Sequence, residues 1–522
     1  GDHRDLHSFP IRRSSDLQAW TRPVTDESLL AGLPESARAL ARQTARQRGS
    51  DGWLLTLELP SYLPVLNYAD DRELRRELYD AYCTRASDRG PNAGRWDNGP
   101  LMERILALRH ELARLLGFRD YTECSLATKM ADSPDQVLAF LADLAGRARP
   151  QAQNELDELR EFARAHFGIE RLETWDIGYY SEKLRQHRYQ LSQEELRPYF
   201  PTTRVLPGLF AVAEKLFAIT IRPLKDVEVW HPDVRAHEIV DAAGNRRGRF
   251  YLDLYARPHK RGGAWMDGCL ARRLTETGVR LPAAYLVCNF TPPVGDDPAL
   301  LTHGEVITLF HEFGHGLHHL LTTVNYLPVA GIHGVEWDAV ELPSQFLENW
   351  CWSREALALL AGHYRTGEPL PDELYRRMLA ARNFQAGIFM VRQLEFGLFD
   401  FRLHREFDPA RGARVLEVLD EVRRQVAVIV PPDYNRFANA FTHIFAGGYA
   451  AGYYSYKWAE VLSADAFSAF EENGIFDVAT GERFRRSVLE VGGSRPALES
   501  FIEFRGREPR IEPLLRLSGI AA

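Results

Sequence analysis

The stretch His311-Glu312-Phe313-Gly314-His315 predicts both a helix and a metal site. Two histidines four residues apart on a helix lie about one turn apart on the same face, so both imidazoles can reach one ion. Glu312 follows the first histidine, where its carboxylate can face a water molecule held by that ion. This spacing is typical of zinc sites in which the glutamate is the general base.

The residues around this stretch indicate a helix that is buried along one side. Thr302 and Glu305 have the spacing of a capping box, which predicts that the helix begins after Thr302. Apolar residues then recur at helical spacing, namely at Val306, Phe310, Phe313, Leu317, Leu320 and Leu321. The alternative is a core helix that carries hydrogen-bonded histidines and no metal. The cap and the intervening glutamate favour the metal site.

Composition excludes several classes of function. The chain has 522 residues and a net charge of −8, from 64 basic and 72 acidic residues. The basic residues form no cluster, so we expect no nucleic-acid partner. Its five cysteines are scattered without a C-x-x-C pair, which argues against a thiolate zinc site and a disulfide framework. This suits a reducing compartment, and we expect a cytoplasmic monomer. No apolar run approaches the roughly 20 residues of a membrane span, so no membrane partner is expected.

The first residues of the chain have an unusual sequence. His7 to Leu17 resembles the translation of a common sequencing-adapter oligonucleotide, with Ile11 where that translation has threonine. The alternative is an ordinary basic tail. We interpret residues 1–17 as a non-native segment joined to a gene that was cut at its 5′ end. Phe9, Ile11 and Leu17 should then lie outside the core.

The next part of the chain predicts a helical lobe at residues 18–167. Its amphipathic patterns are long and their connections are short, as in all-α domains. These patterns cover residues 27–48, 71–82, 98–116 and 133–167. Residues 53–59 form a short alternating segment that Pro60 stops.

Residues 168–522 are expected to form the catalytic region. Four segments at 219–221, 237–240, 249–255 and 284–289 alternate as strands do, with a hairpin turn at Gly244-Asn245. They predict a small antiparallel sheet directly before the helix that carries His311 and His315, which we call the metal helix. Its edge could pair with an extended peptide, although a purely structural sheet is an equal alternative. Further helices are expected at 338–352, over most of 371–430, and at 437–470 with interruptions at glycines.

A catalytic zinc ion usually takes a third protein ligand. His318 is unsuitable, because positions i, i+4 and i+7 of an unbroken helix span about 10 Å of its axis. His318 and His319 are expected to line a cleft or lie at the surface. A carboxylate on a following helix is the usual solution, and its candidates are Glu336, Glu341 and Glu348. Spacing alone does not choose among them.

The motif at 311–315 followed by W-D-A-V-E-L-P-S-Q-F-L-E-N-W at 337–350 resembles the thimet-oligopeptidase family of zinc peptidases, in particular its bacterial branch. The resemblance extends from residue 18 to the C-terminus. It implies a mainly α, two-lobed zincin with a deep substrate channel and one Zn²⁺ per chain. It also implies that Glu341 is the third ligand. Family members carry a further N-terminal helical region, which this sequence lacks.

The glycine-rich segment, residues 443–456, contains phenol and imidazole groups that can donate hydrogen bonds to an oxyanion. Taken alone, such a cluster is more typical of core or surface packing. The resemblance implies that His443, Tyr449 and Tyr456 approach the scissile bond, although the spacing from His443 to Tyr449 varies between branches of the family.

Two further expectations concern support of the site. Glycines of the glycine-rich segment should allow special backbone conformations and mobility, namely Gly447, Gly448 and Gly452. Ser344, Gln345 and Glu348 share the approximate helix face of Glu341, so one of them is a candidate for orienting a ligand. Plain helix surface is the equal alternative.

The resemblance implies a zinc metalloendopeptidase that hydrolyses short unstructured peptides, including signal-peptide fragments, with Glu312 as general base. One alternative is a peptidyl-dipeptidase of the same superfamily, which residues 337–342 match less well. The other is a truncated, inactive fragment that binds peptide or metal without turnover.

Overall fold

The computed structural model describes residues 20–257, 260–293 and 295–520. Residues 1–17, with the expectation for Phe9, Ile11 and Leu17, therefore lie outside the described residues. Among the described residues, no helix is both long enough and apolar enough to cross a membrane.

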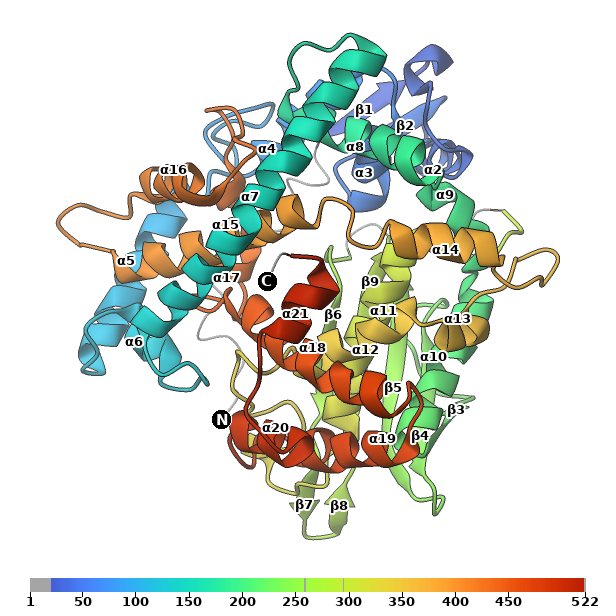
Figure 1. The fold of residues 1–522 in the computed structure, drawn as a ribbon, viewed down its shortest axis with the longest axis vertical. Coiled ribbons are helices and arrows are strands. Elements are labelled where there is room, and N and C mark those ends of the chain that lie inside the picture. The colour runs from blue at the N-terminus through green and yellow to red at the C-terminus, as the bar shows by residue number, and fades with distance from the viewer. Residues whose placement is uncertain (1–19, 258–259, 294, 521–522) are drawn as a thin grey trace. The chain divides into compact units, whose positions relative to one another are not determined.

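The chain forms two compact units, each built from separate stretches. The first contains residues 20–190, 383–454 and 519–520, and the second contains residues 191–382 and 455–518. This grouping differs from a single division after residue 167, because helix α15 (Ala386–Arg405) returns the chain to pack along α7 (Pro134–Phe167) (Figure 1). Such a return between segments more than 200 residues apart leaves no local signal in the sequence.

The first unit is mainly helical and carries one two-stranded sheet. Its strands are β1 (Thr21–Val24) and β2 (Trp53–Thr56), which pair antiparallel. Its helices are η1 (Glu27–Leu30), α2 (Glu35–Gln47), α3 (Leu59–Tyr68), α4 (Arg72–Cys83), α5 (Gly99–Leu115), α6 (Tyr121–Leu126), α7, α8 (Thr174–Tyr189), α15, α16 (Val415–Val426), η5 (Phe437–Ala440) and α17 (Thr442–Phe445). The expected helices at 71–82, 98–116 and 133–167 correspond to α4, α5 and α7.

The contact between α7 and α15 depends on a glycine. A Cβ on Gly387 would lie 2.6 Å from the backbone nitrogen of Ala152, so only glycine permits this approach. The Glu155 carboxylate of α7 also accepts hydrogen bonds from the backbone N–H groups of Gly387 and Ile388, at 3.1 and 2.9 Å. The start of α15 is thereby capped by α7.

The second unit contains the larger sheet and the metal helix. Its strands are β3 (Ile219–Pro223), β4 (Arg235–Asp241), β5 (Arg246–Tyr255), β6 (Trp265–Leu270), β7 (Arg273–Thr275), β8 (Gly278–Arg280) and β9 (Ala283–Phe290). Its helices are α9 (Gln193–Leu196), η2 (Arg197–Tyr199), α10 (Thr202–Phe217), α11 (His303–Leu320), η3 (Leu327–Val329), α12 (Leu342–Glu348), η4 (Asn349–Trp352), α13 (Arg354–Leu360), α14 (Asp372–Ala380), α18 (Ser455–Asn473), α19 (Val478–Phe484), η6 (Arg485–Leu489), α20 (Ala497–Arg505) and α21 (Glu512–Ser518).

The larger sheet has the strand order β3-β4-β5-β9-β6. The four expected strands are present, and the β4–β5 hairpin turns at Gly244, whose φ is +83°. The expectation of a purely antiparallel sheet was wrong, because β5 and β9 pair in parallel. β6, which the sequence did not reveal, pairs antiparallel with β9 and lies at the edge of the sheet.

Helix α11 packs on this sheet through a second small residue. Helix α11 lies against strand β9 (Figure 1). A Cβ on Gly316 would lie 3.1 Å from a methyl group of Leu286 on β9, so a small residue at this position suits the contact. On its other side α11 packs against α12, and α12 packs against α18. The metal motif is therefore held between the sheet and two helices of the same unit.

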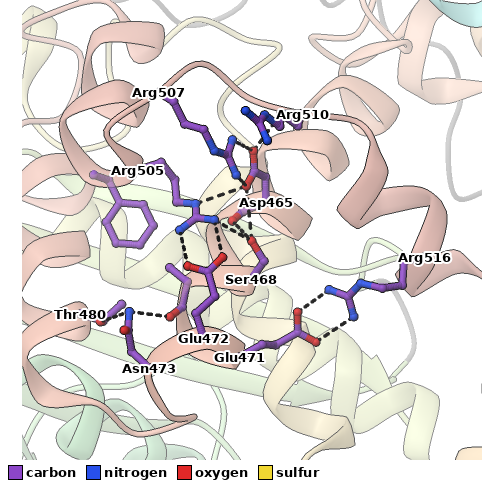
Figure 2. A network of polar contacts seen from close by, with 12 residues as sticks. Asp465, Ser468, Glu471, Glu472, Asn473, Thr480, Arg505, Arg507, Arg510 and Arg516 are labelled. Carbon is purple, nitrogen blue, oxygen red and sulfur yellow. Dashed lines mark hydrogen bonds and ion pairs between the residues drawn. The ribbon is translucent and has the colours of Figure 1, made fainter.

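The C-terminal segment is tied to α18 by a buried carboxylate (Figure 2). Asp465 is fully buried, and it accepts hydrogen bonds from Arg505, from both terminal nitrogens of Arg507 and from the backbone N–H of Arg510. Burial would raise the pKa of Asp465, but these donors hold it below its ordinary value. Because α18 begins at Ser455, this network braces the helix that carries Tyr456.

The structure confirms the mainly α fold and the small sheet beside the metal helix. The expected pair of lobes and the deep channel stay predictions.

Candidate active site

The helix that carries the metal motif begins as the sequence predicts. Thr302 is the N-cap, and its hydroxyl accepts a hydrogen bond from the backbone N–H of Glu305 at 3.1 Å. The Glu305 carboxylate accepts the backbone N–H of Thr302 at 2.8 Å, which completes the capping box.

Three side chains of the second unit converge on one point. The Nε2 atoms of His311 and His315 lie 3.1 and 2.9 Å from the same Glu341 carboxylate oxygen. One donor atom from each of the three side chains lies within 4.8 Å of the other two. This is the set that the sequence resemblance implied.

A glycine of the motif sets the position of Glu341. Glu341 is the N-cap residue of α12, whereas the sequence predicted a helix already under way at residue 338. A Cβ on Gly314 would lie 2.4 Å from the carbonyl oxygen of Pro343 and 2.6 Å from the Cα of Ser344. Only glycine at position 314 lets α12 come this close to α11, and this contact brings Glu341 to the two histidines.

We expect Gly314→Ala to weaken metal binding and to lower stability by about 1–3 kcal/mol, because the new methyl group forces α12 away from α11. Metal affinity and thermal unfolding measure these effects. The matched control is Gly304→Ala in the same helix, where a Cβ meets nothing closer than 3.9 Å. Normal metal affinity in Gly314→Ala would show that α12 does not depend on this contact.

All three residues considered for support of the site make contacts in it. The Ser344 hydroxyl donates to the Glu341 carboxylate at 2.9 Å. A Glu348 oxygen lies 2.7 Å from Nδ1 of His311, an arrangement that fixes the imidazole with Nε2 toward Glu341. The Gln345 side-chain N–H donates to the backbone oxygen of Tyr456 at 3.0 Å. These residues are therefore more than plain helix surface.

Burial and charge set the electrostatics of the three converging groups. Burial by itself lowers the pKa of His311, but Glu341 and Glu348 raise it well above its ordinary value. Burial would raise the pKa of Glu341, but the two imidazoles hold it well below its usual range. Glu341 is thus a carboxylate that stays ionised in a buried place, which suits a ligand of a cation.

Glu312 lies on α11 between the two histidines and has a different environment. Its side chain is buried, with 4% of the residue exposed. Burial raises the pKa of Glu312, and the nearby His311 and His315 oppose this rise. A carboxylate with a raised pKa holds a proton more readily, as a general base must after it takes one.

The three converging residues fit a zinc ion. Two imidazole nitrogens and one carboxylate oxygen are the donor set of many catalytic zinc sites, where they leave a fourth position open. Bonds of about 2.0–2.1 Å in tetrahedral geometry place donor atoms about 3.4 Å apart. The separations of 3.1 and 2.9 Å from each Nε2 to the shared Glu341 oxygen are close to this value.

The other candidate ligands have different roles. The Glu336 carboxylate accepts the backbone N–H of Ala497 at 3.0 Å and caps α20. The expectation that His318 and His319 line a cleft or the surface was wrong, because both are buried in the core. His319 contacts the carbonyl oxygen of Leu270 at 2.9 Å, and burial lowers the pKa of His318 to about 3. His319 faces strand β6 of the sheet, which a helix without its tertiary partners does not reveal.

The residues of the glycine-rich segment fall in both units. Tyr456 belongs to α18 in the second unit, with the converging residues. His443 and Tyr449 belong to the first unit, where their rings lie 6.0 Å apart between centroids. Tyr453 lies beside both rings, with centroids 5.6 and 6.5 Å away, and its hydroxyl donates to Gln393.

The glycines of this segment act differently from the expectation. In its described residues the left-handed backbone conformation falls on Ala451, with a φ of +47°, and not on a glycine. Gly447 is required by contact, since its Cβ would lie 2.8 Å from the carbonyl oxygen of His443. The expected mobility stays a prediction.

Comparison with known proteins identifies the family. A family model described as peptidase family M3 matches residues 65–520. The chain belongs to peptidase family M3. The resemblance to the thimet-oligopeptidase family is thereby confirmed, and this M3 peptidase is a member of a family of metallopeptidases.

Relatives of this M3 peptidase include oligopeptidase A of Salmonella typhimurium, which is 60% identical over 502 residues, 96% of this chain and 74% of the relative. A dipeptidyl carboxypeptidase of Escherichia coli is 36% identical over 503 residues, 95% of this chain and 72% of the relative. Among solved structures, PZ peptidase A with an inhibitor matches with a TM-score of 0.55 and 16% identity, over 93% of this chain and 73% of that chain. This last likeness concerns the fold alone.

Proposed function

We propose that this M3 peptidase is a zinc-dependent oligopeptidase that hydrolyses bonds within short unstructured peptides, among them signal-peptide fragments. The observation that carries the proposal is the convergence of His311, His315 and Glu341 beside the buried carboxylate of Glu312. The high identity to a relative named oligopeptidase A supports the substrate class. We further propose that the enzyme is a cytoplasmic monomer.

The proposed mechanism assigns one task to each group. When bound, zinc would act as a Lewis acid and lower the pKa of water toward 7. Glu312 takes the proton of the attacking water and later passes it to the leaving amine. Its buried position favours both steps, because the raised pKa lets the carboxylate hold the proton between them.

Attack on the scissile carbonyl produces an oxyanion, which needs hydrogen-bond donors. We propose that Tyr449, Tyr456 and His443 supply them, as the family resemblance implies. The edge strand β6 can take an extended substrate as an added strand, because its far side has no partner strand in the described sheet. Gly268 of β6 lies against His319 of α11, which keeps this edge beside the metal helix.

The proposal is tested by two measurements on the same preparation. Zinc content should be about one ion per chain, and a quenched fluorescent peptide should be cleaved at an internal bond. Bound zinc without turnover would support the inactive metal-binding fragment instead. Absence of both would exclude the proposed metal site.

A second experiment separates the oligopeptidase from a peptidyl-dipeptidase. We expect cleavage of a peptide whose C-terminus is amidated, because an internal cut needs no free carboxylate. The lower identity to the dipeptidyl carboxypeptidase agrees with this choice. Release of C-terminal dipeptides only, and only from unblocked peptides, would contradict it.

Tyr449→Phe and Tyr456→Phe should each lower kcat by about 10²-fold and change KM less, as for loss of one transition-state donor. Steady-state kinetics on the fluorescent peptide measure the two constants. Tyr434→Phe and Tyr375→Phe serve as controls, since their hydroxyls bond to Asp80 and to the Trp352 carbonyl. A change in KM alone would mean that the two tyrosines bind substrate and do not stabilise the oxyanion.

A further inference from the structure

We propose that Asp400 is a positioning residue, whose buried carboxylate fixes the backbone of residues 450–453 and thereby orients Tyr449 for catalysis. The inference rests on the proposed role of Tyr449 as a transition-state donor. Asp400 lies in the first unit, as Tyr449 does, and the proposed role of Tyr449 depends on it.

Asp400 binds three consecutive backbone N–H groups. Its Oδ1 accepts from Ala451 at 2.9 Å, and its Oδ2 accepts from Gly452 at 2.8 Å and from Tyr453 at 2.9 Å. The side chain is fully buried on α15. Hydrogen bonds to an ionised acceptor are about twice as strong as those between neutral groups. The three bonds to Asp400 therefore hold the backbone of residues 451–453 firmly in this conformation.

The backbone conformation explains why a carboxylate is needed. Ala451 has a φ of +47°, which costs a residue with a Cβ about 1–2 kcal/mol relative to its ordinary conformations. Successive N–H groups around a left-handed residue form a concave nest that favours an anion. Asp400 supplies this anion from within the protein and stabilises a conformation that the sequence would otherwise avoid.

His404 and Arg109 hold the carboxylate in place. Nη1 of Arg109 lies 3.0 Å from Nε2 of His404, and because arginine only donates, this Nε2 must accept. The proton of a neutral His404 is therefore on Nδ1, which lies 3.1 Å from Oδ1 of Asp400 and 2.8 Å from its backbone oxygen. All three side chains are buried, so the series of contacts from Arg109 through His404 to Asp400 is rigid.

The opposite side of the same backbone is also held. The Ser125 hydroxyl lies 3.1 Å from the carbonyl oxygens of Ala450 and Ala451. Lys129 in turn donates to that hydroxyl at 2.7 Å. Asp400 therefore binds the N–H groups of residues 451–453, and Ser125 contacts the carbonyl groups of residues 450 and 451.

The backbone segment that Asp400 binds contacts Tyr449 through one hydrogen bond and one ring contact. The backbone N–H of Gly452, which Asp400 accepts, also lies 3.0 Å from the carbonyl oxygen of Tyr449. The Tyr453 ring, whose backbone Asp400 binds, lies beside the rings of Tyr449 and His443. Asp400 thus acts on the proposed donor through the backbone of residues 450–453.

The test is a double-mutant cycle between Asp400→Asn and Tyr449→Phe. In asparagine an NH₂ group replaces one carboxylate oxygen, so at least one of the three backbone N–H groups loses its acceptor. We expect Asp400→Asn to lower kcat at least about 10-fold, with unchanged zinc content and a smaller change in KM. If Asp400 acts through Tyr449, the double variant should lie within about threefold of the slower single variant.

Amide hydrogen exchange gives a readout that does not depend on activity. The amides of Ala451, Gly452 and Tyr453 should be protected in the unsubstituted protein and exchange faster in Asp400→Asn. The matched control is Glu395→Gln on the same helix, whose buried carboxylate binds Arg392 and Arg423 instead. It should lower stability and leave both kcat and the exchange of these three amides unchanged.

Each outcome decides the proposal. Losses in kcat that multiply in the double variant, or a normal kcat in Asp400→Asn with Tyr449→Phe impaired, overturn the positioning role and leave the oxyanion role intact. A normal kcat in Tyr449→Phe overturns the oxyanion role itself. If Asp400→Asn does not fold, Ser125→Ala replaces it in the same cycle, with the same expected non-additivity and a smaller loss in kcat.

Discussion

Glu312→Gln should lower the rate of peptide turnover by about three orders of magnitude or more and leave the metal in place. The amide has nearly the shape of the carboxylate, so His311, His315 and Glu341 keep their positions. It cannot take a proton from water at neutral pH, and the attacking water then lacks its base. Turnover of the fluorescent peptide and zinc content of the same sample measure the two halves of this expectation.

The control for this variant is Glu305→Gln on the same helix. Glutamine also serves at this position of a capping box, so we expect helix, metal content and turnover to stay near normal. A zinc-replete Glu312→Gln enzyme with turnover within tenfold of the unsubstituted protein would eliminate Glu312 as the general base.

Glu341→Gln should weaken zinc binding more than about 100-fold, which is the upper range for loss of an outer hydrogen-bond partner of a ligand. The reason is that a neutral amide replaces the only negatively charged ligand of the zinc ion, and two imidazole ligands alone hold the ion poorly. Glu348→Gln should have a smaller effect of about 10–100-fold, because Glu348 contacts the ring of His311 and not the proposed ion position. Competition with a chelator gives the three affinities on one scale.

Glu336→Gln is the control for the ligand series. Its carboxylate caps α20, so the change should cost about 1 kcal/mol or less of stability and leave zinc affinity unchanged. The reverse pattern, with zinc lost in Glu336→Gln and kept in Glu341→Gln, would contradict the ligand set.

The electrostatics of the site could not be obtained from residue types. Burial would raise the pKa of all three buried glutamates of the site, yet the two imidazoles keep Glu341 ionised, whereas the pKa values of Glu312 and Glu348 stay raised. These directions depend on which charges face each carboxylate after folding. A pattern of charges along the chain does not contain that information.

The sequence by itself determined the features that depend on neighbouring residues. The capping box at Thr302, the helix that carries the two histidines and the long helix from Pro134 follow from local hydrogen bonding and from the 3.6-residue repeat. The pair His311 and His315 also follows from this repeat. Family resemblance, and not spacing, selected Glu341.

Only the tertiary structure decided the features that join distant segments. The approach of α12 to α11 at Gly314, the parallel pairing of β5 with β9 and the bond of Asp400 to residues 451–453 link residues that lie from 29 to more than 50 positions apart. The burial of His318 and His319, and the contact of His319 with β6, are of the same kind. Local propensity specifies which face of a helix is apolar, but the partner that covers that face, and the polar group placed opposite a strained backbone, are fixed only when the chain has folded.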